Sequence, residues 1–313
     1  ADLLLDKKVD TLKSLHTLTH IGHPKREGGP VPLMKQVLEG RFPNLKSLTV
    51  VSQDLLGCSG TILSKLYKLQ EIHFENNLGY DLITFMNNFI IEDKASGTKY
   101  AHLKKLVFRE RESTNDLTLD GYTAETFPGF AGMRHLDLYN SSICRKGLHK
   151  MLEICNNEGQ LRVLNIGGAR RLTFPQDNFD RRAVSLTQNV INFKIILELV
   201  PQLTHLYIPE LGFTSFAAKI CYSEMQKYGF EKINLSLLDI SYTNIDGRGL
   251  IDLFCVSNRQ PVTFKLDELL LDGVAVDKGT LRVLESRGHV RAARNNLNKV
   301  KWREYGINSL IID

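Results

Sequence analysis

Three histidines stand beside side chains that could take part in acid–base or metal chemistry. His73 lies between two glutamates, His135 lies two residues from Asp137, and His205 lies two residues from Tyr207. Imidazole and carboxylate groups transfer protons near neutral pH and bind metal ions. The histidines are far apart in sequence, however, and no cysteine or further carboxylate stands at ligand spacing beside them. We therefore expect neither a metal site nor a cofactor.

Catalysis is not indicated either. The signatures HExxH, GxSxG, GxxxxGK[ST] and a helix-opening GxGxxG do not occur in the sequence. A mixture of histidine, tyrosine and charged side chains is typical of protein contacts, which place aromatic anchors within a charged surround. Any solvated sheet surface can carry the same mixture, and that plainer interpretation stays open. We expect a binding protein and not an enzyme.

The histidines fall within a short frame, LxxLxL, whose apolar positions recur nine times. The frames begin at residues 15, 45, 69, 103, 133, 161, 203, 235 and 266, so the period varies from 24 to 42 residues. Between frames the apolar spacing becomes helical, at residues 143–155, 183–200, 215–228, 247–256 and 277–286. Residues 109–132 lack that spacing and are expected to be irregular. These are uneven leucine-rich repeats.

The repeats predict an α/β fold. We expect a right-handed leucine-rich-repeat solenoid, a horseshoe with a parallel sheet on the concave face and helices on the convex face. Residues 1–313 would form a single domain of about nine repeats, with 287–313 as a C-terminal capping tail. Asn77, Asn140 and Asn244 follow their frames and are predicted to bond backbone groups at the turns.

The frame also predicts which side chains a partner could reach. Its leucines point into the core, so the third, fifth and seventh positions project from the concave face. Charge reversal at two of them, Lys105 and Arg109, is expected to abolish partner binding and leave the melting temperature nearly unchanged. The partner-binding candidates are Glu71, His73, Glu75, Lys105, Arg109, His135, Asp137, Tyr139, Asn165, His205 and Tyr207.

The C-terminal tail combines apolar and basic residues. A stack of repeats needs a cap over the apolar edge of its last unit, and the predicted capping residues are Trp302, Arg303, Tyr305 and Ile307. The net charge of +5 is concentrated in the same tail. Phosphate contacts would come from Arg291, Arg294, Lys299 and Lys301. Nucleic-acid or chromatin binding through this tail is therefore the alternative to a protein partner.

Composition limits the remaining possibilities. With 42% hydrophobic and 24% charged residues, the chain resembles an ordinary soluble globular protein. No uninterrupted apolar run approaches the 18 residues or so of a membrane span, so no membrane contact is expected. We expect a monomer. The chain begins with Ala1 and not with methionine, and we interpret it as a fragment.

Several stretches resemble the C-terminal leucine-rich-repeat region of the fungal Dia family of F-box proteins. They are RFPNLKSLTV, LKKLVFRE, LRVLNIGG followed by LTFP, LLDISYTNI and, above all, the closing WREYGINS. The resemblance covers nearly the whole chain and is firmest over residues 133–313. The irregular segments 109–132 and 167–190 match least well.

The resemblance implies a function. Members of this family are replisome-associated substrate receptors of SCF ubiquitin ligases, and their repeats would recognise the replicative MCM helicase for ubiquitylation when replication terminates. The family also has tetratricopeptide repeats and an F-box that binds the Skp–cullin adaptor. Residues 1–40 lack the LPxE type of F-box start, so we expect both regions to be absent here. The implied location is the nucleus.

Overall fold

In the part of the chain that the structure describes, ten parallel strands form one open sheet, in which each strand is hydrogen-bonded to the next along the chain. The computed structural model describes residues 15–21, 42–52, 66, 68–77, 103–109, 119, 130–169, 172, 195–211, 213–227, 232–254, 263–286 and 290–294. This architecture is an α/β solenoid of the leucine-rich-repeat type, as the frames predict. Contacts group the chain into two compact units, residues 1–205 and 206–313.

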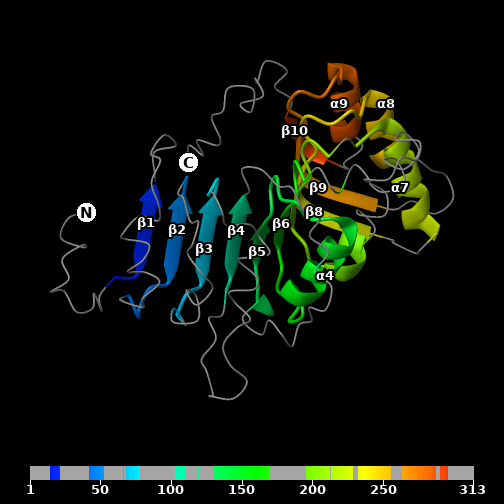
Figure 1. Ribbon diagram of the computed structural model, residues 1–313. Coiled ribbons are helices and arrows are strands. Elements are labelled where there is room, and N and C mark those ends of the chain that lie inside the picture. Colours follow the sequence, from blue (N-terminus) through cyan, green and yellow to red (C-terminus); the bar gives the residue numbers. More distant parts are fainter. Residues whose placement is uncertain are drawn as a thin grey trace, which may run out of the picture. The chain divides into compact units, whose positions relative to one another are not determined.

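The first unit holds six complete strands that lie side by side in chain order (Figure 1). They are β1 Thr17–Ile21, β2 Ser47–Val51, β3 Glu71–Glu75, β4 Lys105–Arg109, β5 His135–Asp137 and β6 Val163–Asn165. The register places equal positions of successive frames opposite one another, for example Leu106 against Leu136 and Leu136 against Leu164. Strand β7 His205–Tyr207 starts at the last residue of this unit.

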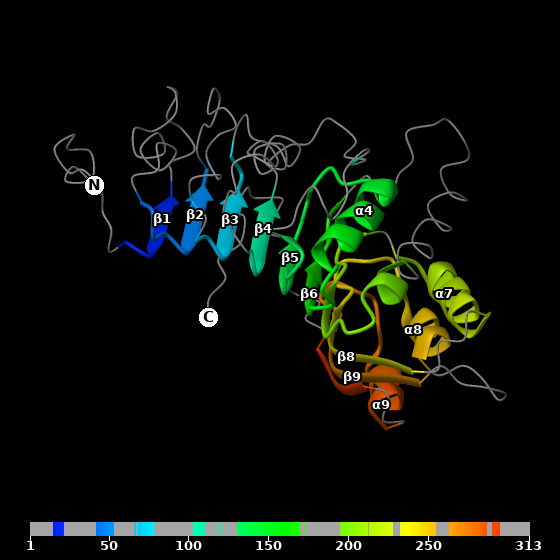
Figure 2. The same cartoon turned by 90° about the horizontal axis from the view of Figure 1, so that it is seen from below.

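Helix α4, Arg145–Cys155, covers one face of the sheet beside β5 and β6 (Figure 2). Its apolar residues Leu148, Met151 and Leu152 are buried, as are the frame leucines. Burying a leucine side chain contributes about 2 kcal/mol, and the frame supplies up to three apolar side chains per repeat. The stacked core therefore lies on the α4 side, and the alternate side chains of each strand lie on the other face.

The second unit repeats the pattern with longer strands. It contains α7 Ser215–Lys227, β8 Lys232–Asp239, α8 Gly247–Phe254, β9 Thr263–Leu270, α9 Lys278–Ser286 and β10 Val290–Arg294. Two helices begin at aspartates: Asp246 Oδ1 accepts the Gly249 N–H and Asp277 Oδ1 accepts the Thr280 N–H, both at 2.8 Å. Such N-caps satisfy backbone donors that the first helical turn leaves open.

All nine predicted strands are present, and four described helices fall within predicted segments. Residues 195–199 are also helical, at the end of the segment predicted at 183–200. The strand β10 was not predicted: it lies in the segment assigned to the capping tail and pairs in parallel with β9. The sequence VRAAR lacks the frame leucines, so the repeat pattern does not predict this strand. The single domain over 1–313 stays a prediction.

A left-handed residue stands at the eighth position of the frame in every repeat where the structure describes that position. These residues are Ser52, Asn76, Asn140, Gly168, Glu210, Tyr242 and Gly273, with φ between 54° and 69°. Their conformation turns the chain away from its strand. Of the predicted turn asparagines, Asn140 occupies this position, and Asn77, one residue later, donates its amide to the Val50 carbonyl at 3.0 Å. Asn244 lies beyond the turn, and Tyr242 takes the left-handed conformation in its place.

Candidate functional site

The candidate site lies in the first unit, on the face of the sheet that α4 does not cover. Its side chains alternate with the core leucines of β3 to β6. We call this surface the open face, and we define it by Glu71, His73, Glu75, Lys105, Arg109, His135, Asp137, Tyr139 and Asn165.

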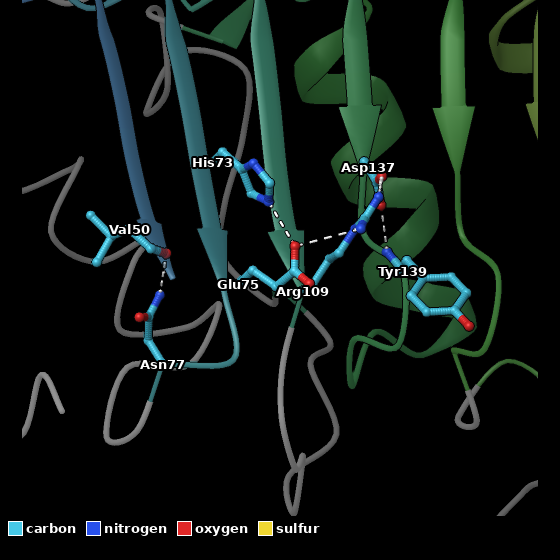
Figure 3. A network of polar contacts seen from close by, with 7 residues as sticks. All are labelled: Val50, His73, Glu75, Asn77, Arg109, Asp137 and Tyr139. Atoms are coloured by element: carbon cyan, nitrogen blue, oxygen red, sulfur yellow. Dashed lines mark hydrogen bonds and ion pairs between the residues drawn. The ribbon is translucent and has the colours of Figure 1, made fainter. Parts of the chain in front are cut away.

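A network of charged side chains joins three strands of the open face (Figure 3). Arg109 on β4 binds Asp137 on β5, with Nη2 2.7 Å from Oδ2, and approaches Glu75 on β3 at 3.5 Å. His73 Nε2 lies 2.8 Å from the same glutamate oxygen. Asp137 Oδ1 accepts the backbone N–H of Tyr139 at 3.0 Å. Arg109 also lies 5.8 Å from the centre of the Tyr139 ring, within cation–π range.

Two carboxylates hold the charge of Arg109 in place. Burial opposes that charge, but Asp137 and then Glu75 outweigh it, so the pKa of Arg109 is raised above its ordinary value. The side chains of Arg109, Glu75 and Asp137 are 16%, 7% and 5% exposed. A buried ion pair of this kind fixes geometry, and removing one partner is costly. The network therefore holds three strands in register.

The burial of this network corrects part of the sequence-based expectation. Glu75 and Asp137 were expected to project from the sheet, but both are buried, as is Val107 between them. Both side chains lie within the network that His73 and Arg109 form with them (Figure 3). Because Arg109 lies in this network, reversing its charge together with that of Lys105 is now expected to lower the melting temperature as well. Their role in partner binding stays a prediction.

Other predicted contact residues remain accessible. Glu71 is exposed, and Lys105, His135 and His205 are half-buried. Cα positions of Glu71, Lys105 and His135 are paired in register across β3, β4 and β5. Asn165 on β6 accepts the Gly167 N–H through Oδ1 at 3.0 Å. Tyr207 belongs to the second unit.

Thr204, which the sequence did not single out, sets the tautomer of His205. Its hydroxyl donates to the Arg162 carbonyl at 2.9 Å and lies 2.8 Å from His205 Nδ1. A hydroxyl has one proton, so the second contact requires His205 Nδ1 to be the donor. Neutral His205 therefore presents Nε2 as an acceptor. No pattern in the sequence indicates this contact.

His135 is neutral at physiological pH. Burial and then the charge of Lys105 lower its pKa to about 4, with smaller effects in the same direction from Arg109 and His205, and Asp137 opposes them. Because the folded pKa lies below the ordinary value, the unfolded chain binds a proton more readily. The contribution to stability is complete above about pH 6.5 and is lost as the pH falls towards 4.

Replacing His135 by glutamine is therefore expected to weaken the acid sensitivity of folding. Between pH 7 and pH 4.5 the unmodified chain should lose about 1 to 2 kcal/mol more stability than the variant, allowing for partial solvent screening. Urea denaturation at a series of pH values measures the difference. Parallel pH profiles for both chains would show that His135 is not the group responsible.

The predicted tail residues are only partly described. Arg291 and Arg294 lie on β10, where Arg294 Nε is 2.7 Å from Glu268 Oε1 on β9. Arg294, one of the predicted phosphate contacts, is therefore already paired with a glutamate. Lys299, Lys301, Trp302, Arg303, Tyr305 and Ile307 lie outside the described residues.

Within the described ranges, no group of three or more histidine, cysteine or acidic side chains could hold a metal ion. None of the helices that the structure describes is long and apolar enough to cross a membrane. Among described cysteines, Cys144, Cys155 and Cys221 are free thiols.

The fold and the open face together define a leucine-rich-repeat protein with a polar sheet surface. Comparison with known proteins gives a distant relationship: the chain is 24% identical over 299 residues to Protein DIA2 of Saccharomyces cerevisiae, a match that covers 89% of this chain. The chain spans 39% of the length of that relative. No protein-family model matches the chain.

Proposed function

We propose that this chain is the substrate-recognition region of an F-box/leucine-rich-repeat receptor of an SCF-type ubiquitin ligase. The observation that carries the proposal is the match to Protein DIA2 over 89% of the chain, together with a repeat fold of the kind such receptors use. In this proposal the region performs no reaction. It binds a folded protein, and the F-box of the whole receptor recruits the Skp–cullin adaptor.

The proposed partner is the replicative MCM helicase, which the receptor would present for ubiquitylation when replication terminates. The receptor would then act in the nucleus, as a monomer. Support for the contact surface comes from the open face, where a buried network fixes three strands and leaves Glu71, Lys105 and His135 accessible. A rigid, pre-organised surface loses little conformational freedom on binding.

Charge reversal at Lys105 tests this proposal. Lys105→Glu is expected to weaken binding of the purified helicase at least about tenfold, because it places like charges at the contact. Its effect on stability should stay below about 0.5 kcal/mol. Lys150→Glu on α4, the same charge change on the covered side of the sheet, is the control and should bind normally. Biolayer interferometry measures both.

Each failure has a separate meaning. If the unmodified chain does not bind the helicase, the partner is wrong. If it binds but Lys105→Glu binds equally well, the open face is not the contact. Binding to forked DNA that falls steeply with salt, and that is lost when Arg291, Arg294, Lys299 and Lys301 become alanine, would favour the nucleic-acid alternative.

A further inference from the structure

The charged groups of the Arg109 network are paired with one another. The guanidinium contacts both Asp137 and Glu75, and Glu75 also contacts His73. These carboxylates are almost fully buried, so a partner would have to break the network to reach them. The recognition chemistry of the open face must therefore come from the accessible groups beside the network.

Lys105 and Glu71 are the accessible charges. Their Cα positions are paired across β4 and β3. In the part of the chain that the structure describes, neither side chain forms an ion pair or a side-chain hydrogen bond. Lys105 and Glu71 therefore carry opposite charges on adjacent strands, and both are accessible to a partner. Lys105 lies on the side of β5, and Glu71 lies on the side of β2.

His135 stands next to Lys105 on the side away from Glu71, with its Cα paired to that of Lys105. The charged and titratable groups that act on its ring are Lys105, Arg109, Asp137 and His205. Only Asp137 favours an added positive charge there, and its carboxylate already binds Arg109. Burial is the main reason why the pKa of His135 is lowered, and Lys105 has the largest effect of the neighbouring charges. A lysine ammonium placed beside a neutral imidazole would attract an anion.

We propose that Lys105 and His135 form a docking position for one carboxylate or phosphate group carried by a protein partner. The Lys105 ammonium supplies a charged donor, and the His135 ring supplies a neighbouring N–H. This inference rests on the proposed function and deepens it, because it names the chemistry of the partner's contact. The same geometry gives the contact a direction, since Glu71 favours a basic group on the β3 side.

A nucleic-acid backbone fits this position less well than a single acidic side chain. Phosphates follow one another every few ångströms along a strand, so a backbone lying over Lys105 would also meet Glu71 on one side. Asp137 and Glu75, with one guanidinium between them, leave the neighbouring network with an excess of negative charge. A partner with one acidic group and a basic neighbour avoids both repulsions.

Anion titrations of the purified chain, followed by NMR, test the docking position. With millimolar inorganic phosphate we expect saturable shifts of the His135 ring signals, and a rise of its pKa from about 4 by about one pH unit. Sodium acetate and two short peptides, one with glutamate and one with phosphoserine, show whether a carboxylate suffices or a phosphate is required. Since none of these four probes is the helicase, this result does not depend on helicase binding.

Three variants show whether the shifts depend on Lys105 at this position or on the overall positive charge of the surface. Lys105→Ala should abolish the shifts, and Lys104→Ala, which removes the adjacent exposed lysine, should leave them intact. The swap Glu71→Lys with Lys105→Glu keeps the net charge but moves the cation to β3, so it should also abolish them. Equal shifts in the swap, absence of any shift at His135, or tighter binding of a DNA oligonucleotide at the same residues would overturn the proposal.

Discussion

Replacing Arg109 by methionine should lower the free energy of unfolding by about 3 to 5 kcal/mol. Methionine keeps most of the packing volume but removes the charge that compensates Asp137, 2.7 Å away, and Glu75, 3.5 Å away. Both carboxylates are buried, so water cannot replace the lost partner. Urea denaturation at pH 7, with the slope compared between variants, measures the change.

Two comparisons show whether charge is the cause. Arg134→Met removes an exposed arginine one strand away and should change stability by less than about 0.5 kcal/mol. The triple variant Arg109→Met, Glu75→Gln, Asp137→Asn removes all three charges and should be more stable than Arg109→Met alone, because no buried charge is left unpaired. A loss below about 1 kcal/mol for Arg109→Met would mean that the network does not hold the strands together.

The strand positions could be predicted because the frame reports burial on one side of each strand. Leu48, Leu106, Leu136 and Leu164 are all 0% exposed, and each is the middle leucine of its frame. Their neighbours at the third position point the other way, as alternation requires. A pattern within six residues contains this information, since it depends only on which face of one strand is apolar.

The burial of the charged network could not be predicted in the same way. Glu75, Arg109 and Asp137 come from three frames separated by uneven intervals, and their contacts depend on the register between strands. Alternation gives the direction of a side chain, but not whether its neighbours on adjacent strands cover it. The spacing of Glu75 from Asp137 in the sequence carries no sign of the arginine that joins them.

The left-handed turn at the eighth position shows a similar limit. Asparagine adopts this conformation more easily than most residues, and Asn140 was a usable signal. Glu210 and Tyr242 adopt it with φ of 60° and 55°, although neither residue type favours it. There the hydrogen bonds of the stack impose the conformation: the Glu210 N–H donates to the Ser241 carbonyl and the Tyr242 N–H to the Asp272 carbonyl.

Gly273→Ala is expected to destabilise the second unit by about 2 to 4 kcal/mol. Gly273 occupies the eighth frame position with φ of 69°, and an added Cβ would meet the Tyr242 ring at 2.5 Å. The left-handed conformation costs an alanine about 1 kcal/mol, and forcing the ring aside adds about 1 to 3 kcal/mol. Thermal and urea unfolding of the purified variant measure the total.

Gly159→Ala separates the two costs, because Gly159 has a similar φ of 65° but no atom within 4 Å of the added Cβ. It should lose only the conformational part, about 1 kcal/mol. The remaining difference should disappear when Tyr242→Ala is the common background, since the ring is then gone and the double-mutant cycle isolates its contact. Equal losses for Gly273→Ala and Gly159→Ala would mean that the ring moves freely. The requirement for glycine in the ninth repeat would then come from the left-handed backbone alone, as it does at Gly159.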